Sequence, residues 1–192
     1  MATQSEGTEK ICLDEIVSLN KAAERCKNNG DLKGALNKLS AALKRTDVAG
    51  LTAIRAEILN NIGHIQVALG WLNAALTSFK ESAVVYGSTG DQLGCGHQFG
   101  NVGSVYRDLK EYNEALGSYY QAISCFRKEK YQAGLADQFG NVGYIYAMRG
   151  DPVKATEWYE KAAKLYMAAG EKEQFCLVKN NIRAITVNQR LV

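Results

Sequence analysis

The hexapeptide QFGNVG occupies residues 98–103 and occurs again at residues 138–143, 40 positions later. Glycine and asparagine are poor helix formers, yet the apolar residues around both copies have the three- and four-residue spacing of a helix. A glycine inside a helix costs ~1 kcal/mol relative to alanine. Because glycine returns in register at Gly63, Gly103 and Gly143, the repeat indicates a packing requirement.

Other positions recur at the same 40-residue step. The recurring small residues are Ala35, Ala75, Ala115 and Ala155, the large ones are Leu39, Phe79, Tyr119 and Tyr159, and the expected helix ends are Gly30, Gly70, Lys110 and Gly150. Gly103 and Ala115 are small because two helices cross there, and a larger side chain would force their axes apart. Tyr119 fills the space beside that crossing. Each repeat is therefore predicted to be a pair of packed helices.

The periodicity predicts nine helices. Their expected ranges are 9–29, 32–46, 50–69, 72–87, 91–109, 112–128, 131–149, 152–168 and 172–189. Asp151 and Pro152 suit the start of a helix, because aspartate caps a helix N-terminus and proline is favoured at the first helical position. Residues 1–8 are polar and are expected to be disordered.

Composition limits the class of protein. The 192 residues include one proline and 18 glycines, which favours long helices over many short strands. The 23 basic and 20 acidic residues are spread along the chain, so no nucleic-acid arm is indicated. Five cysteines without a CxxC pair argue against a disulfide framework or a zinc site. No apolar run approaches a membrane span, and the chain is predicted to be cytoplasmic.

The order of large, small and aromatic positions resembles the tetratricopeptide repeat over residues 20–168. The tripeptides at 99–101 and 139–141 are similar to the signature of the Leu-Gly-Asn-repeat G-protein signalling modulators, which share long repeats with the kinesin light chains. The resemblance implies an all-α, right-handed α-solenoid that forms one domain over 9–192. Its expected parts are the repeats 9–49, 50–90, 91–130 and 131–170 and a capping helix at 171–189.

In such families the first helix of each pair lines a concave groove, and one residue type recurs on that face. The recurring residues are Asn61, Asn101, Asn141 and Asn181. An amide has donors and an acceptor, so this ladder suits the backbone of an extended peptide. The alternative is that the amides bridge adjacent helices of the solenoid. The candidate groove residues are these four asparagines together with His64, His97, Arg107 and Tyr144.

The sequence favours no chemistry beyond binding. No phosphate loop, nucleophile elbow or pair of catalytic carboxylates is recognisable, so neither an enzyme nor a cofactor is predicted. His64 and His97 are the only histidines and are not expected to share a metal. The carboxylate clamp of chaperone-binding relatives needs basic residues at matching first-helix positions. The positions that match the clamp here are Val17, Lys21, Asn61, His97 and Asn101, and of these only Asn61 has the residue type found in the clamp. A receptor for chaperone tails is therefore not predicted.

The predicted function is therefore a non-enzymatic adaptor whose groove binds an extended segment of a partner protein. Neither binding of nucleic acid nor insertion into a membrane is expected. Two alternatives stay open. One is a regulatory peptide sensor, because bacterial quorum-peptide receptors also have long repeats of this type. The other is an architectural subunit that self-associates through exposed aromatic residues such as Trp71 or Trp158.

Overall fold

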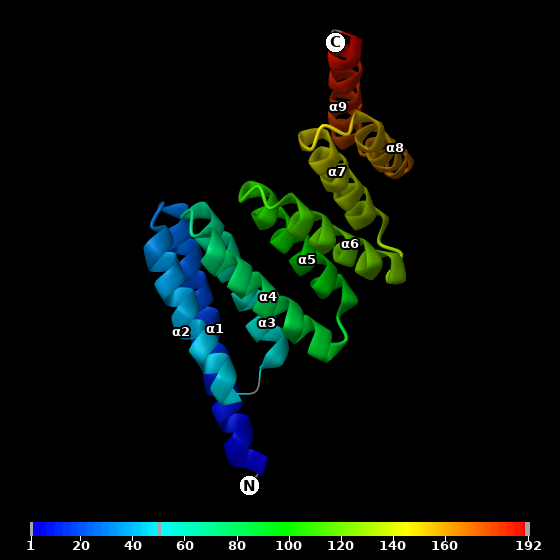
Figure 1. Cartoon of the computed structure of the whole chain (residues 1–192). Coiled ribbons are helices and arrows are strands. Elements are labelled where there is room, and N and C mark those ends of the chain that lie inside the picture. Colours follow the sequence, from blue (N-terminus) through cyan, green and yellow to red (C-terminus); the bar gives the residue numbers. More distant parts are fainter. Residues whose placement is uncertain (1, 50, 191–192) are drawn as a thin grey trace. The chain divides into compact units, whose positions relative to one another are not determined.

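A computed structural model describes residues 2–49 and 51–190, which form nine helices and no strand (Figure 1). The helices are α1 (Ala2–Asn28), α2 (Leu32–Ala49), α3 (Thr52–Ala68), α4 (Leu72–Thr89), α5 (Gln92–Asp108), α6 (Tyr112–Lys128), α7 (Gln132–Met148), α8 (Pro152–Ala169) and α9 (Lys172–Arg190). From α2 onward their ends agree with the predicted ranges to within three residues. Residue 50, the predicted start of the third helix, lies outside the described residues. None of the helices in the described ranges is long and apolar enough to cross a membrane.

The first helix is longer than predicted. The sequence predicted disorder over residues 1–8, but α1 begins at Ala2. Residues 2–8 contain no proline, and adding residues to an existing helix is far easier than starting a new one. The prediction of disorder is therefore corrected to helix from Ala2, and residue 1 lies outside the described residues.

The chain divides into two compact units, Met1–Asp91 and Gln92–Val192, where the sequence predicted one domain. In unit 1, α1 packs on α2, α2 on α3 and α3 on α4; in unit 2, successive helices from α5 to α9 pack in the same way, and α5 also contacts α7. A repeat chain has no single centre, because each helix pair contacts mainly its neighbours. Each unit accordingly has a hydrophobic core of its own.

The glycine that recurs at positions 63, 103 and 143 lies where two helices cross. A methyl group added at Gly103 would lie 2.6 Å from Cδ1 of Tyr119. At Gly143 the distance to Cδ1 of Tyr159 would be 2.9 Å. Gly63 has the same relation to Phe79, at 2.5 Å from Cε1. The alanines on the second helix of each crossing, Ala35, Ala75, Ala115 and Ala155, are fully buried. The predicted register of small and large residues is confirmed.

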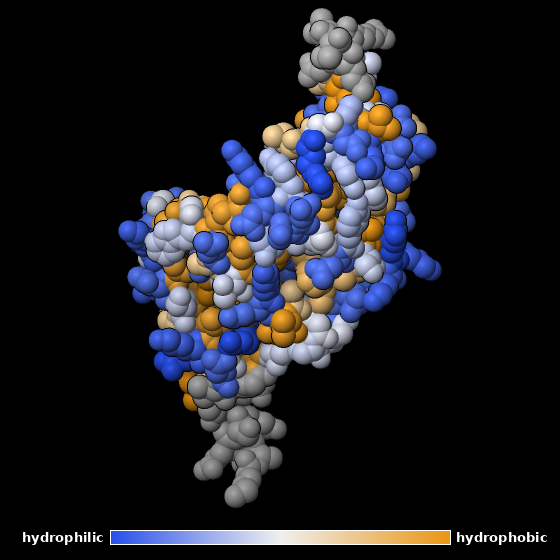
Figure 2. All heavy atoms as spheres, in the orientation of Figure 1, coloured by the Kyte–Doolittle hydropathy of each residue, from blue (hydrophilic) through white to orange (hydrophobic). Residues whose placement is uncertain are grey.

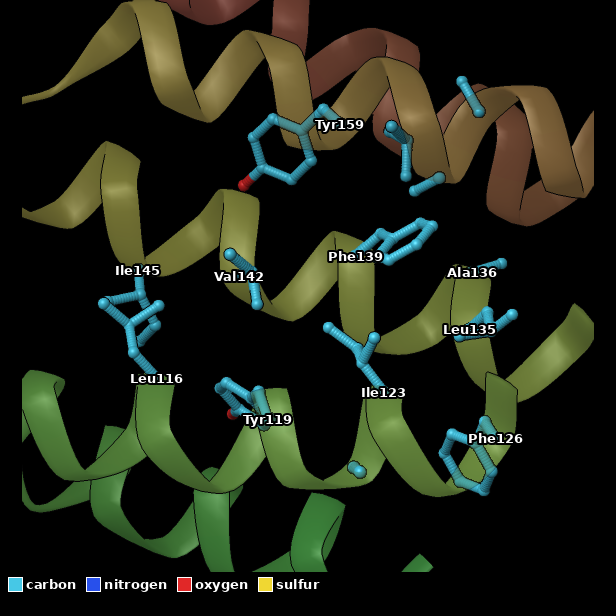
Figure 3. Packing of buried hydrophobic residues seen from close by; sticks show 14 of the residues in the cluster. Leu116, Tyr119, Ile123, Phe126, Leu135, Ala136, Phe139, Val142, Ile145 and Tyr159 are labelled. Carbon is cyan, nitrogen blue, oxygen red and sulfur yellow. The ribbon is translucent and has the colours of Figure 1, made fainter. Parts of the chain in front are cut away.

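The core of unit 2 is built mainly from α6, α7 and α8 (Figure 3), and α9 adds Val178. Leu116, Tyr119, Ile123 and Phe126 of α6 face α7, and Leu135, Phe139, Val142 and Ile145 of α7 meet them, with Tyr159 of α8 on the other side of α7. On α5, Val102 is buried, and Phe99 and Tyr106 pack half-buried against this cluster. The cluster fixes α5 and α7 in place and leaves their remaining faces to line a surface.

Most helix ends have a residue in the left-handed conformation. Gly30, Gly70, Gly90, Gly150 and Gly170 have φ between 74° and 78°. Lys110 and Lys130 occupy equivalent positions with φ of 63° and 54°. The ends are alike in their hydrogen bonds too, since the amide after Lys110 donates to the carbonyl of Tyr106 at 2.9 Å, as in a Schellman motif. Both lysines therefore hold a conformation that costs a side-chain-bearing residue free energy.

Replacing Lys110 or Lys130 with glycine is expected to raise the free energy of unfolding by about 1 kcal/mol, because glycine adopts this conformation without a steric penalty. Urea unfolding followed by circular dichroism measures the change. The matched control is Gly150→Lys, which should lower the stability by a similar amount. Equal stabilities of Lys110→Gly and the native chain would mean that the local strain is relieved in another way.

Candidate functional site

A hollow of about 490 Å³ lies on the face of unit 2 formed by the first helices of its repeats. We call it the unit 2 hollow. Its lining comes from α5, α7 and α9, with two tyrosines of α8: His97, Gly100, Asn101, Ser104, Arg107, Asp137, Gln138, Gly140, Asn141, Tyr144, Tyr159, Tyr166, Leu177, Val178 and Asn181. The lining is mixed, with amides and hydroxyls beside apolar side chains, as is usual for sites that bind by a few placed polar groups.

The first glycine of each QFGNVG copy lines the unit 2 hollow. A methyl group at Gly100 would lie 3.2 Å from Nε2 of Gln138, so this glycine gives space to a side chain of α7. A methyl group at Gly140 would meet nothing within 4 Å. Asn20 and Asn60 stand at the equivalent positions of the first two repeats. The two glycines of the hexapeptide therefore have different roles: the second permits a helix crossing, whereas the first gives space to Gln138 at position 100 and leaves the surface open at position 140.

Three ladder asparagines lie half-buried in the unit 2 hollow, in different environments. Nδ2 of Asn141 donates to Oε1 of Gln138 at 3.3 Å, a contact within α7. The side chain of Asn181 on α9 hydrogen-bonds Tyr159 on α8. Asn101 lies on α5 next to Gly100, the glycine against which the side chain of Gln138 packs. The bridging interpretation thus describes Asn181, while the bond from Asn141 to Gln138 stays within α7.

Tyrosine hydroxyls fix several groups around the hollow. Tyr166, a buried side chain of α8, donates to Oδ1 of Asp137 at 2.7 Å. Burial, then this hydrogen bond and the charge of Asp137, raise the pKa of Tyr166 well above its ordinary value. On the α5 side, Tyr119 donates to Oγ of Ser104 at 3.4 Å. These bonds join second helices to the first-helix surface and hold it in one arrangement.

The basic and aromatic candidates are also held by neighbours. Arg107 binds Asp108 through Nε at 3.0 Å and Nη2 at 2.9 Å, and its guanidinium carbon lies 5.9 Å from the ring centre of Tyr144. His97 is exposed, and its ring meets Phe126 edge-on at 5.1 Å between centroids. Tyr144 is 42% exposed, so its ring offers an accessible apolar face.

Unit 1 has a smaller hollow of about 300 Å³ between α1, α2 and α3, which we call the unit 1 hollow. Asn61 and His64 of α3 line it opposite Asn20, Glu24 and Lys27 of α1. Oδ1 of Asn20 is buried and accepts no hydrogen bond from another described residue. Burial against the protein, with a smaller contribution from the charge of Lys27, lowers the pKa of His64, whose ring contacts Phe79 at 5.1 Å.

The structure places all eight candidate residues in one of these two hollows. Asn101, Asn141, Asn181, His97, Arg107 and Tyr144 line the unit 2 hollow, and Asn61 and His64 line the unit 1 hollow. Sequence reasoning assigned Tyr159 only to the core and missed Tyr166. One signal was available: a tyrosine at a core position needs a partner for its hydroxyl, whereas Phe79 and Leu39 at equivalent positions do not.

The two tryptophans proposed for self-association differ in exposure. Trp71 is 45% exposed. Trp158 is half-buried, because its ring packs on Phe139 at 5.4 Å and Tyr120 at 5.8 Å, and Nζ of Lys161 lies 3.9 Å from its centroid. On the face shown in Figure 2, apolar areas are interrupted by polar and charged ones. Trp158 is therefore corrected to a packed residue, which leaves Trp71 as the exposed tryptophan.

Tyr159 makes the stability depend on pH in the alkaline range. Burial, and to a smaller extent the neighbouring Tyr144, raise the pKa of Tyr159 from 10.0 to about 12 against an opposing effect of the bond to Asn181. The folded chain therefore favours the protonated hydroxyl. That contribution to stability is fully present below pH 10 and is lost as the pH rises towards 12.

We expect the free energy of unfolding to fall between pH 9.5 and 11.5, and to fall less steeply in Tyr159→Phe. Urea titrations across that range measure the slope. At neutral pH this variant should lose about 1 kcal/mol, because the side chain of Asn181 loses its partner. An identical slope in both proteins would show that Tyr159 does not carry the alkaline transition.

Comparisons with known proteins agree with the helical-repeat fold. Two family models, each described as tetratricopeptide repeat, match residues 56–83 and 99–168. No curated protein matches in sequence. Among solved structures, the apo form of RapI is similar with a TM-score of 0.85 at 11% identity, over 92% of this chain and 49% of RapI. This chain thus spans about half the length of RapI.

Two other structures are similar over nearly their whole length. MamA has a TM-score of 0.61 at 19% identity, with 92% of this chain and 94% of MamA covered. A Podospora anserina kinesin light chain with TPR-like repeats has a TM-score of 0.64 at 14% identity, with 92% and 97% covered. At these identities the likeness establishes the fold, an all-α helical repeat of the solenoid type.

The fold and the family models define the class of protein as a helical-repeat scaffold for protein interactions, a fold that is typically non-catalytic. The two matched stretches cover half of the chain. The chain belongs to the tetratricopeptide repeat family.

Proposed function

We propose that the chain is a non-enzymatic adaptor that binds an extended segment of a partner protein in the unit 2 hollow. The partner's backbone lies across α5, α7 and α9, where amide groups of Asn101 and Asn141 pair with its N–H and C=O groups. His97, Arg107 and Tyr144 contact its side chains. The cytoplasmic location predicted from the sequence belongs to the same proposal.

The observation that carries this proposal is the gathering of six candidate side chains from three successive first helices around one hollow. Gly140 also lines the hollow, and a methyl group added there would meet nothing within 4 Å. A surface without a side chain lets another backbone approach closely. Hydrogen bonds from Tyr119 and Tyr166 hold the lining in place, which lowers the entropy cost of binding.

The experiment is selection of a random peptide library on the chain, followed by titration calorimetry of the selected peptides. Gly140→Leu should abolish binding, because leucine fills the hollow, and should leave the fold intact. The matched control is Gly117→Leu on α6, where an added methyl group also meets nothing within 4 Å and which lies outside the hollow lining. This control should bind normally. Equal binding by the two variants would place the peptide elsewhere.

The same material separates the adaptor from the other two functions. Capture of large partner proteins, lost in Gly140→Leu, supports the adaptor. Tight binding of a short free oligopeptide with no larger partner supports a peptide sensor. A mass that rises with concentration in light scattering, and that falls in Trp71→Ser, supports self-association through the exposed tryptophan.

A further inference from the structure

The unit 2 hollow contains one carboxylate that has no basic partner. Asp137 of α7 lines the hollow, and its Oδ1 accepts the hydroxyl of Tyr166 at 2.7 Å. Among the described residues, no lysine, arginine or histidine nitrogen lies within 4 Å of this carboxylate. Arg107, the arginine in the hollow lining, is bound instead to Asp108. The charge of Asp137 is therefore uncompensated within the hollow.

The hydrogen bond from Tyr166 fixes the direction of the Asp137 side chain. Tyr166 is only 8% exposed, and the charges of both Asp137 and Glu171 act on its hydroxyl. A carboxylate has about four positions that accept hydrogen bonds, and Tyr166 uses one. The remaining positions are available to a ligand, at a side chain already held in one orientation. Such a site suits a cation, since charge-assisted hydrogen bonds are stronger than neutral ones.

The position of Asp137 along the hollow selects the kind of cation. Its equivalents on the flanking first helices are His97 of α5 and Leu177 of α9, 40 residues before and after it. Asp137 thus lies on the middle helix of the three. A partner segment that crosses from α5 to α9 has its middle residues, and not its N-terminal amine, next to Asp137. The positive groups of the segment at that place are therefore side chains.

We propose that Asp137 is a specificity-determining residue that binds a lysine or arginine side chain of the extended partner segment, with Tyr166 as its positioning residue. This inference rests on the proposed function, because it assigns one side-chain preference to the same hollow. The partner segment therefore carries a basic residue at the place where it crosses α7.

The test uses a random peptide library displayed with both ends joined to a carrier protein, so that no free terminus is present. The library is selected in parallel on the native chain, Asp137→Asn and Asp137→Lys. Peptides selected on the native chain should be enriched in lysine and arginine at one position. Asp137→Asn should lose that enrichment, and Asp137→Lys should replace it with aspartate and glutamate.

Affinity measurements complete the test. For a synthetic peptide from the native selection, Asp137→Asn should weaken binding about tenfold, and changing the basic residue of the peptide to glutamine should give the same loss. The two changes together should cost little more than either alone. Tyr166→Phe keeps the charge, so it should weaken binding less and retain the preference for a basic residue. Circular dichroism confirms that each variant is folded.

Two contrary outcomes are distinguishable. In the first, peptides bind the native chain, do not bind Gly140→Leu and show no enrichment in lysine or arginine. The hollow then binds peptides, but the role of Asp137 is overturned. If no selected peptide depends on Gly140, the proposed function fails, and the preference assigned to Asp137 fails with it.

Discussion

Replacing Gly103 with leucine is expected to lower the free energy of unfolding by about 1–3 kcal/mol, the usual cost of overpacking a core. Even the first carbon of the new side chain would lie 2.6 Å from the ring of Tyr119, a residue with no exposed surface. That ring is enclosed by the unit 2 core, so it has no space into which to move. Ala115→Leu, at the other fully buried small position of the same crossing, should have a similar effect.

The loss should be local as well as large. Repeats contact mainly their neighbours, so hydrogen exchange should accelerate in α5 and α6 and change little in α1–α3. Gly117→Leu is the control, because it introduces the same side chain on α6 with nothing within 4 Å; its stability should stay equal or rise slightly, since leucine is a better helix former than glycine. Unchanged protection of α5 and α6 in Gly103→Leu would contradict the crossing at Gly103.

The fold was predictable because its determinants repeat along the chain. Gly63, Gly103 and Gly143 each face an aromatic ring 16 residues later, so the same contact between helices occurs at the same spacing in three repeats. Helix ends followed from the spacing of Gly30, Gly70 and Gly150. Lys130 was not foreseen as a left-handed residue, because lysine carries no preference for that conformation and the hydrogen bonds of the turn impose it.

The site was predictable only for residues that stand on the first helices. Asp137 stands on the first helix of its repeat, but its bond to Tyr166 joins residues 29 positions apart on different helices. Such a bond depends on side-chain rotamers and on the distance between helices, which spacing does not encode. For the same reason the sequence left open whether Asn181 binds a ligand or bridges helices, and the contact with Tyr159 favours the bridge.

Changing Asn101 or Asn141 to alanine is expected to weaken peptide binding about five- to 150-fold, because each truncation removes a pairing and strands a desolvated peptide group at ~1–3 kcal/mol. The peptide is one recovered by the library selection, and titration calorimetry measures its affinity. Stability should change little in Asn141→Ala, since the bond of that side chain to Gln138, at 3.3 Å, lies within one helix.

Asn181→Ala provides the contrast within the same ladder, because its amide contacts the hydroxyl of Tyr159 across two helices. This variant should lower the melting temperature, and any loss of affinity should follow from the loosened α8–α9 contact. Asn101 and Asn141 lie close along one ligand, so the double variant need not show the sum of the single losses. Unchanged affinity in both single variants, together with lower melting temperatures, would mean that the whole ladder bridges helices as Asn181 does.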